Sequence, residues 1–230
     1  MAILPDAVAI IPARGGSKRL PRKNVMPFRG KPMIAHTIEA ALESGVFTEV
    51  VVSSDDAEIL TACAGYPVRA LQRPADLGSD TARVVDVCIH VLKNEISVLP
   101  EVFACLYATA PLRTAEDIRA AVGLVVPGRC DFAMAVTAYP LPPHQALKQG
   151  NDGSLAPMWP ELVNRRDDEI GALAVDNGST YACASAAFIR ERSFYGPGLK
   201  GHMMPASRSV DINTADDLAL AKFYAERAAA

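Results

Sequence analysis

Short apolar runs alternate along the chain with longer segments in which apolar residues recur every three or four positions. A run of four to eight apolar residues is typical of a buried strand, whereas the longer period is typical of a helix with one buried face. Five runs are predicted to be strands: 8–12, 49–54, 68–71, 103–108 and 132–136. The segments between them are predicted to be helices: 32–44, a segment that begins at 57, 81–96 and a segment that begins at 114.

Residues at the ends of these segments support their boundaries. Gly45 follows the first predicted helix, as a C-cap glycine would, and Asp55 or Asp56 is expected to cap the second. Thr114 and Asp117 have a spacing close to that of a capping box. Strands that alternate with helices predict βαβ units. We therefore expect an α/β fold, a Rossmann-like three-layer sandwich with a mostly parallel sheet.

The alternation stops after Thr137. Prolines and glycines become frequent, and Asp152-Gly153 is a favourable pair for a hairpin turn. We expect a single domain over 1–230 with an inserted element of hairpin and loop at about 138–177. This element is expected to lie over the sheet edge or to meet a second subunit. Trp159 is expected to anchor a dimer contact, because exposed apolar clusters mark partner surfaces.

After the insertion the chain is predicted to return to the main fold. Residues 181–187 are predicted to form a strand and residues 209–212 a last short one. A helix is predicted over 214–227, with Thr214 as its N-cap and two aspartates in its first turn.

Composition narrows the class of protein. Half of the 230 residues are hydrophobic and the net charge is -3, which disfavours disorder. No apolar run reaches the roughly 18 residues that span a bilayer, and the first residues lack the basic region of a signal peptide. We therefore expect a cytoplasmic protein that does not enter membranes. The five cysteines have no metal-ligand spacing and are expected to be buried, reduced thiols.

The distribution of charge is more informative than its total. Residues 14–31 contain seven cations and no acid, which leaves 16 basic residues against 26 acidic ones elsewhere. One positive loop on an acidic body indicates a focused anion site. Nucleic-acid surfaces usually spread their basic residues over a face or alternate them with aromatics, so no nucleic-acid partner is expected.

The basic loop follows the first predicted strand in the segment AIIPARGGSKRLPRKN. A loop that leaves the carboxyl end of a parallel strand opens into the crevice where such sheets bind ligands. Gly15 and Gly16 would let the backbone approach a phosphate. Arg14 could bind phosphate oxygens in a bidentate manner, and Lys18 and Lys23 would act as point charges. The alternative is a solvated basic loop in which these cations have no ligand.

The same segment resembles the signature of the acylneuraminate cytidylyltransferases, the CMP-sialic, CMP-legionaminic and CMP-pseudaminic acid synthetases. Further matches follow in order along the chain: GKPMIAHTIEAALESG, VVVSSDDAEI, QRPADLGSD, YATAPLRTAEDI, NRRDDE, DNGSTY and VDINTADDLALA. The resemblance implies a fold of the nucleotide-diphospho-sugar transferase type in a homodimer. It implies that CTP and an acidic nine-carbon 3-deoxy-keto sugar give the CMP-sugar and pyrophosphate, with Mg²⁺ as cofactor.

The resemblance also implies roles for particular residues. Arg14 and Lys18 would stabilise the leaving pyrophosphate, and Asp211 would bind Mg²⁺. Further residues would contact the nucleotide or the sugar: Ala13, Gly15, Gly16, Ser17, Lys23, Asn24, Arg73, Ser79, Tyr107, Arg165 and Arg166. Among these, Arg73 and Ser79 correspond to positions that contact the cytidine.

Three positions depart from the family pattern. Asn213 stands where a second aspartate is common, so it is a metal ligand through its carbonyl or only precedes a helix cap. Tyr107 stands where sialic acid enzymes often have glutamine, and this form resembles the pseudaminic acid enzymes. The run from Asn177 to Tyr181 instead resembles the sialic and legionaminic acid enzymes, so the identity of the sugar stays open. The run that contains Arg165 and Arg166 either binds the substrate carboxylate or forms solvated ion pairs with the acids that follow.

Asp80 follows Ser79 and has two interpretations. It either lies near the nucleotide or caps the next helix.

Two alternatives to the predicted activity stay open. The chain could be a homologue that binds the nucleotide but catalyses weakly or not at all, as the changes at Asn213 and Tyr107 suggest. It could also be another sugar nucleotidyltransferase, with a preference for a different base.

Overall fold

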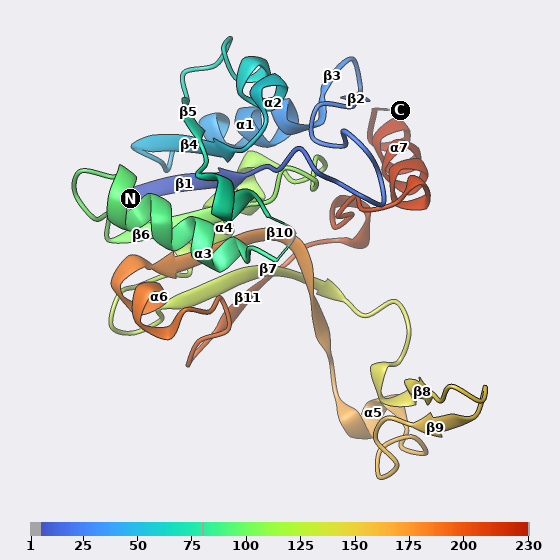
Figure 1. The fold of residues 1–230 in the computed structure, drawn as a ribbon. Helices are drawn as coiled ribbons and strands as arrows, with labels where there is room; N and C mark the ends of the chain where they lie inside the picture. The colour runs from blue at the N-terminus through green and yellow to red at the C-terminus, as the bar shows by residue number, and fades with distance from the viewer. Residues whose placement is uncertain (1–5, 80, 230) are drawn as a thin grey trace.

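The computed structural model describes residues 6–79 and 81–229. Within them, a central seven-stranded sheet has the order β11-β7-β10-β6-β1-β4-β5 (Figure 1). Its strands are β1 Ala7–Pro12, β4 Glu49–Ser54, β5 Arg69–Gln72, β6 Val102–Leu106, β7 Phe132–Ala138, β10 Ala174–Ala184 and β11 Lys200–Met203. Neighbouring strands are parallel except at β10, which is antiparallel to both β6 and β7. The prediction of a mostly parallel sheet is therefore confirmed.

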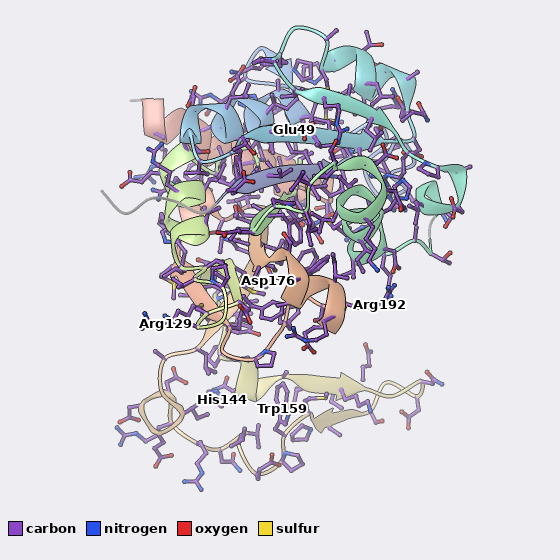
Figure 2. All side chains as sticks on the ribbon, turned by 90° about the vertical axis from the view of Figure 1, so that its left-hand side faces the viewer. Glu49, Arg129, His144, Trp159, Asp176 and Arg192 are labelled. Atoms are coloured by element: carbon purple, nitrogen blue, oxygen red, sulfur yellow. The ribbon has the colours of Figure 1, made fainter. Side chains whose placement is uncertain are left out.

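Helices cover both faces of this sheet, which gives the predicted three layers. In Figure 2 the helices α1 and α4 lie on one side of the sheet, and α3 and α6 lie on the other. The helices are α1 Met33–Ser44, α2 Ala57–Ala62, α3 Val84–His90, α4 Ala115–Gly123, α5 Asp167–Ile170, α6 Ser185–Glu191 and α7 Ala215–Ala229. A π-helical stretch, Val91–Glu95, continues α3, and short 3₁₀ turns form at Ala75–Gly78, Pro143–Gln145 and Ala206–Arg208.

The core lies between the sheet and its helices. Ala9, Ile10 and Ile11 of β1 are fully buried, as are the five residues of β6. Burial of each large aliphatic side chain contributes roughly 1.5–3 kcal/mol, so these continuous apolar strands stabilise the centre of the sheet. All five cysteines are free and buried, as predicted.

The predicted helix boundaries are largely confirmed. Gly45 ends α1 in the left-handed conformation, with φ 64°. Asp56 caps α2, since its carboxylate accepts from the backbone N–H groups of Glu58 and Ile59 at 2.9 and 3.2 Å. Thr114 and Asp117 form a capping box at α4. The helix predicted over 81–96 begins only at Val84, and Asp80 lies outside the described residues.

Of the two strands predicted near the C-terminus, one is confirmed with different bounds and the other is absent. The strand predicted over 181–187 runs from Ala174 to Ala184, and its predicted end belongs to α6. The first half of this strand was not predicted, because residues Asp176 to Thr180 are polar. They also interrupt the regular pairing of β10 with β7. Residues 209–212 form no strand. The edge strand is instead β11, a short segment without strand-like alternation.

The inserted element is an arm, residues 139–173, that projects from the body of the molecule (Figure 1). It connects the end of β7 to the start of β10, so the predicted limits of 138–177 are corrected to these residues. The arm carries α5 and a small hairpin of β8 Leu147–Gln149 and β9 Leu155–Pro157, whose turn includes Gly153 at φ 82°. Its exposed apolar side chains include Leu141, Leu147, Leu155, Met158 and Trp159.

A second small hairpin, β2 Pro27–Phe28 and β3 Lys31–Pro32, follows the basic loop and leads into α1.

Candidate active site

The carboxyl ends of β1, β4 and β6 meet at one edge of the sheet. Because the chain proceeds from β1 to β4 on one side and places β6 on the other, a crevice opens above β1. A cavity of about 220 Å³ lies there, which we call the first cavity. Its lining residues are Pro12, Arg14, Lys23, Asn24, Val84, Tyr107, Ala108, Thr109, Asp211 and Asn213.

Two aspartates after β4 hold the glycine turn of the basic loop. The backbone N–H of Gly15 donates to Asp55 Oδ1 at 3.1 Å. A Cβ at Gly15 would lie 2.3 Å from Asp56 Oδ2, so no larger residue fits there. A Cβ at Gly16 would meet nothing within 4 Å. Gly15 is therefore required by packing against β4, and the open side of the turn is at Gly16. Ala13 is buried, and its N–H donates to Ser53 O at 3.0 Å.

The cations of the loop have different environments. Arg14 is half-buried and lines the first cavity, whereas Lys18 is exposed and Ser17 is half-buried. Lys23 Nζ donates to Asn213 Oδ1 at 2.9 Å and to Ile212 O at 3.2 Å. Burial lowers the pKa of Lys23, and the nearby Asp211 carboxylate opposes this shift. Lys23 therefore connects the basic loop to the segment before α7.

Asn24 offers an acceptor to the first cavity. It is only 4 % exposed, and its Nδ2 donates to Arg14 O at 2.9 Å. Its buried Oδ1 has no hydrogen-bond partner among the described residues. A buried amide oxygen without a partner is costly, and a ligand donor such as an amino group or hydroxyl would satisfy it.

Asp211 lies at the centre of a hydrogen-bonded chain. Thr109 Oγ1 donates to its Oδ1, and Asn213 Nδ2 donates to its Oδ2 at 2.7 Å. Asn213 thus bridges Lys23 and Asp211, with its oxygen towards the cation and its nitrogen towards the carboxylate. Gly178 packs against Asp211, where a Cβ would lie 3.0 Å from the aspartate Cβ.

This arrangement fits a divalent cation at Asp211 only in part. Asp211 is the one carboxylate among the described residues that line the first cavity, and each of its oxygens keeps a lone pair beyond the hydrogen bond it accepts. Asn213 Oδ1 faces Lys23 and presents no oxygen beside Asp211. Within 6–79 and 81–229, no cluster of three or more Asp, Glu, His or Cys side chains could hold a metal. A cation here would depend on Asp211 and on oxygens of the ligand.

A second cavity, of about 550 Å³, adjoins the first and shares Tyr107 and Asp211 with it. Its wall includes the ring of Tyr181, whose centroid lies 5.2 Å from that of Tyr107. Asp176 accepts hydrogen bonds from the hydroxyls of Tyr181 and Tyr195, the latter at 2.6 Å. The charged side chains among its described lining residues are Asp176, Asp211 and Asp217, without a lysine or arginine.

The two residues predicted to contact cytidine, Arg73 and Ser79, line neither the first nor the second cavity. Arg73 is buried, and its guanidinium donates to Ser53 O at 2.6 Å and to Leu77 O at 3.4 Å. Burial lowers the pKa of Arg73. These bonds fix the loop after β5 to the end of β4. Ser79 is exposed, and its hydroxyl donates to Asp76 O at 3.0 Å.

Arg165 and Arg166 are not brought to either cavity of their own chain. Both are exposed and lie on the arm. The Arg166 guanidinium forms an ion pair with Asp168 at 2.5 Å, in which the arginine side chain is 77 % exposed. Within one chain, Arg166 therefore forms a solvated ion pair, which was the alternative to binding the substrate carboxylate.

Sequence reasoning missed several residues that build this site. Thr109 and Gly178 contact Asp211, and Asp55 holds Gly15. Arg113 is 4 % exposed and donates to the backbone oxygens of Ser179 and Tyr107 beneath both cavities. Burial lowers the pKa of Arg113 to about 10. No local pattern identifies these contacts, because each partner is distant along the chain.

Comparison with known proteins gives the family. Residues 8–125 match the model of a family described as cytidylyltransferase. The chain is 35% identical over 219 residues to the pseudaminic acid cytidylyltransferase of Campylobacter jejuni, covering 94% of both chains. It is 36% identical over 222 residues to the CMP-N,N'-diacetyllegionaminic acid synthase of Legionella pneumophila, covering 93% of both.

A solved structure of a CMP:2-keto-3-deoxy-manno-octonic acid synthetase in complex with CTP shares the fold, with a TM-score of 0.70 and 21% identity over 97% of this chain and 99% of that one. Among the described residues, no helix has the length and apolar character needed to cross a membrane. The matched family model and the two relatives, each aligned over nearly the full length, show that the chain belongs to the cytidylyltransferase family.

Proposed function

We propose that this protein transfers CMP from CTP to a nine-carbon 3-deoxy-keto acid sugar and releases pyrophosphate. The observation that carries the proposal is the pair of joined cavities. The first is lined by Arg14 and Lys23 of the basic loop, the second is large enough for a sugar, and Asp211 lines both. Relatives with names of this kind align over more than nine-tenths of the chain.

In this mechanism the triphosphate lies along the glycine turn. Arg14 and Lys18 bind the oxygens of the leaving pyrophosphate and stabilise the charge that grows on them. The turn at Gly16 leaves space for phosphate next to the backbone. Ser17, beside it, adds a hydroxyl donor. Such transfers depend on positioning and charge neutralisation more than on covalent chemistry with the protein, so no nucleophilic side chain is required.

The nucleoside and the metal are assigned to other residues in and around the first cavity. The free Oδ1 of Asn24 accepts a hydrogen bond from the nucleotide, and Arg73 and Ser79 shape the loop beside it. Asp211 would hold Mg²⁺, with the remaining ligands supplied by the nucleotide and water. Bound there, Mg²⁺ would neutralise phosphate charge and fix the phosphate geometry for in-line attack. Asp211 also borders the second cavity, where the attacking sugar hydroxyl is oriented.

The acceptor is proposed to be a pseudaminic, legionaminic or sialic acid, and Tyr107 favours the first. The tyrosine ring lies between the two cavities and packs on Tyr181, where it replaces a hydrogen-bonding glutamine with an aromatic surface. A panel of the three sugars with CTP tests this choice. A Tyr107→Gln variant that keeps the same order of kcat/KM would show that this residue does not select the sugar.

The second cavity is incomplete for an anionic sugar within one chain, since its charged lining residues are aspartates. We propose a homodimer in which the arm of one subunit supplies Arg165 or Arg166 to the cavity of the other. A planar guanidinium suits the sugar carboxylate. The exposed apolar residues of the arm, with Trp159 39 % exposed, would be buried in this contact.

Mixing variants tests the shared site. Arg14→Ala and a double change of Arg165 and Arg166 to alanine each inactivate one half of the composite site. Each mixed dimer should have about half of the wild-type activity, because one of its two sites is intact, and a random 1:1 mixture should have about a quarter, because about half of its dimers are mixed. No recovery on mixing would reject the exchange of arms, and a Trp159→Asp variant that remains dimeric would reject the proposed contact.

Pyrophosphate release from four nucleoside triphosphates, each with the acid sugars and Mg²⁺, tests the central proposal. A preference for UTP, GTP or ATP would reject the cytidylyl assignment, and CTP binding without turnover on any sugar would favour a non-catalytic homologue. A cytoplasmic location is also proposed, since five free and buried cysteines suit a reducing compartment. Cell fractionation checks it.

A further inference from the structure

The segment between β11 and α7, residues 204–213, brings Asp211 to the site. The same segment also supplies Ala206, Ser209 and Val210 to the wall of the second cavity. It belongs to no strand of the sheet, so the ladder of backbone hydrogen bonds does not fix its position. Its placement depends on separate contacts with the body of the protein.

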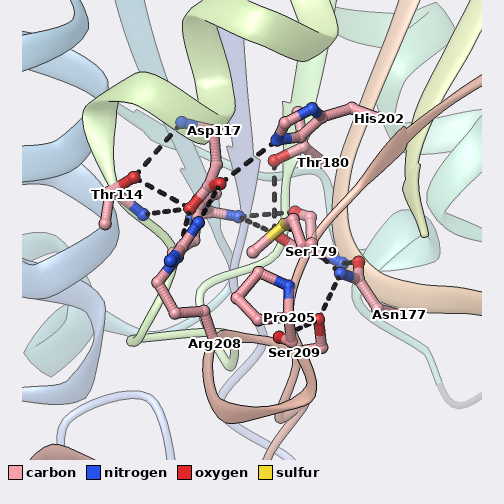
Figure 3. A network of polar contacts seen from close by, with 11 residues as sticks. Thr114, Asp117, Asn177, Ser179, Thr180, His202, Pro205, Arg208 and Ser209 are labelled. Carbon is pink, nitrogen blue, oxygen red and sulfur yellow. Dashed lines mark hydrogen bonds and ion pairs between the residues drawn. The ribbon is translucent and has the colours of Figure 1, made fainter. Parts of the chain in front are cut away.

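Those contacts occur at intervals along the segment. Met204 N–H donates to Val136 O at 2.8 Å, and Ile212 N–H donates to Thr109 O at 2.8 Å. Between them, Asn177 Nδ2 donates to Ser209 Oγ at 3.0 Å. Lys23 and Thr109 add hydrogen bonds near the end of the segment, at residues 211–213. A further contact is an ion pair at Arg208, the one ion pair that the described residues of this segment form with the body. Figure 3 shows the contacts of Arg208 with Asp117 and of Asn177 with Ser209.

The partner of Arg208 is Asp117 in the first turn of α4, a carboxylate that is 1 % exposed. Arg208 binds it through a fork, Nε to Oδ2 at 3.0 Å and Nη2 to Oδ1 at 2.9 Å. The Thr114 hydroxyl and N–H donate to the same carboxylate at 2.8 and 3.0 Å, and His202 Nε2 lies 3.1 Å from Oδ1. A bidentate pair with a buried carboxylate fixes both distance and direction.

Arg208 is therefore attached to a buried carboxylate by two hydrogen bonds, only three residues before Asp211. Neither Arg208 nor Asp117 lines the first or the second cavity. The capping box alone would need only Thr114 and Asp117, so the bidentate arginine has no part in starting the helix. What it does add is a fixed attachment of the segment to α4.

The geometry points to Arg208 as a positioning residue: its ion pair with Asp117 holds the 204–213 segment so that Asp211 meets the metal-bound phosphates and the acceptor sugar. The inference rests on the proposed function for its catalytic consequence. Its structural part, the attachment of the segment, stands independently of any reaction.

The test uses a double variant, Arg208→Gln with Asp117→Asn, which removes both charges and leaves no buried carboxylate without a partner. Amide hydrogen exchange is followed by mass spectrometry in the full-length protein without ligands. Exchange in residues 204–213, which include the Ile212 amide, should become about tenfold faster or more, the factor that follows when local opening is roughly 1.4 kcal/mol easier. Exchange in β1 should rise by no more than the measured loss of global stability explains, and by a smaller factor than exchange in residues 204–213.

The loss of this attachment should change the dependence on Mg²⁺ and on the sugar, but not the binding of CTP. The double variant should need about tenfold more Mg²⁺ for half-maximal pyrophosphate release and should lose roughly tenfold to a hundredfold in kcat/KM for the sugar, as misplaced groups do. CTP binding without metal, measured by calorimetry, should be unchanged. Arg208→Lys should recover part of both losses, since an ammonium reaches the carboxylate but cannot form the fork. Arg190→Gln, which breaks the exposed ion pair with Glu191, is the matched control.

Wild-type exchange in residues 204–213 together with a wild-type Mg²⁺ midpoint would overturn the proposal. A uniform increase of exchange throughout the protein would also overturn it, because Asp117 and Arg208 would then support only the global fold. Should the double variant fail to fold, Arg208→Lys alone decides through the same two measurements. Failure of the wild-type protein to turn over CTP would reject the proposed function and leave the exchange result to decide the attachment.

Discussion

Replacement of Asn213 by aspartate gives a direct test of the chain of contacts around Asp211. In the structure Asn213 lies 2.7 Å from an Asp211 oxygen and 2.9 Å from the Lys23 ammonium. A carboxylate at this position would be repelled by Asp211 and attracted by Lys23. At these separations and an effective dielectric constant of about 20, each Coulomb energy is about 6 kcal/mol, so the two nearly cancel.

What does not cancel is the hydrogen bond from the Asn213 amide to Asp211. Its loss at a charged acceptor should lower the free energy of unfolding of the metal-free protein by about 1.5–3 kcal/mol. Mg²⁺ should reverse this loss, because the cation would replace a repulsive pair of carboxylates with a favourable set of ligands. We expect the Mg²⁺ midpoint of Asn213→Asp to fall by about tenfold, equivalent to roughly 1.4 kcal/mol of added binding.

Thermal melts and pyrophosphate release, each over a Mg²⁺ titration, measure both effects. Asn213→Ala removes the bridge without adding charge, so its Mg²⁺ midpoint should rise rather than fall. Asn94→Asp adds the same charge at an exposed position and is the control for net charge. The reasoning is refuted if Asn213→Asp leaves the metal-free melt and the Mg²⁺ titration unaltered, because Asn213 would then contact neither Asp211 nor the metal.

Three further predictions concern the phosphate site, a glycine and acid stability. Arg14→Ala and Lys18→Ala should each lower kcat by about 10²–10³-fold with nearly unchanged thermal melts, and activity retained in both would remove the proposed triphosphate site. Gly178→Ala should cost about 1–2 kcal/mol of stability, because alanine would adopt a left-handed φ of 64°. It should also reduce turnover by displacing Asp211, so a wild-type melt and rate would contradict the packing seen here. Burial would raise the pKa of Asp117, but hydrogen bonds from Arg208, Thr114 and His202 outweigh it and hold that pKa well below its usual range. A lowered carboxyl pKa stabilises the fold above the unfolded value of about 3.9, and this contribution is lost as the pH falls below it. Asp117→Asn should thus lower the unfolding free energy by about 2–3 kcal/mol at pH 7. This loss is smaller than the loss expected at a fully buried ion pair, because Arg208 is partly exposed. The difference in unfolding free energy between wild type and variant should be smaller at pH 3. Urea denaturation at both pH values measures it, and a constant difference would refute the assignment.

The sequence predicted the parts of the fold that depend on local pattern. Continuous apolar runs identified β1, β4 and β6, because strands buried on both faces need no polar side. Asp56 and Thr114 identified helix starts, because a cap forms within three residues of chain. The basic loop after β1 was predicted as an anion site from its charge, its glycines and its place after a strand. Arg14, Lys23 and Asn24 of this loop line the first cavity, and the binding of an anion there stays a prediction.

Contacts between distant residues could not be predicted in this way. Gly15 and Asp55 are 40 positions apart, and Thr109 and Asp211 are 102 apart. The first half of β10 was predicted to be a loop, because its polar residues and Gly178 lack the apolar pattern of a strand and its pairing is irregular. Sequence also assigned Gly15 to phosphate approach, whereas its missing side chain is required by Asp56.

The five buried thiols give this protein a built-in reporter of its own unfolding. Burial raises the pKa of Cys63 to about 11 and also raises the pKa of Cys105 and Cys183, so few thiolates form in the native state. A thiol-reactive dye should therefore label the chain only when the fold opens. Labelling rates of the purified variants would rank them by opening free energy, without an engineered probe.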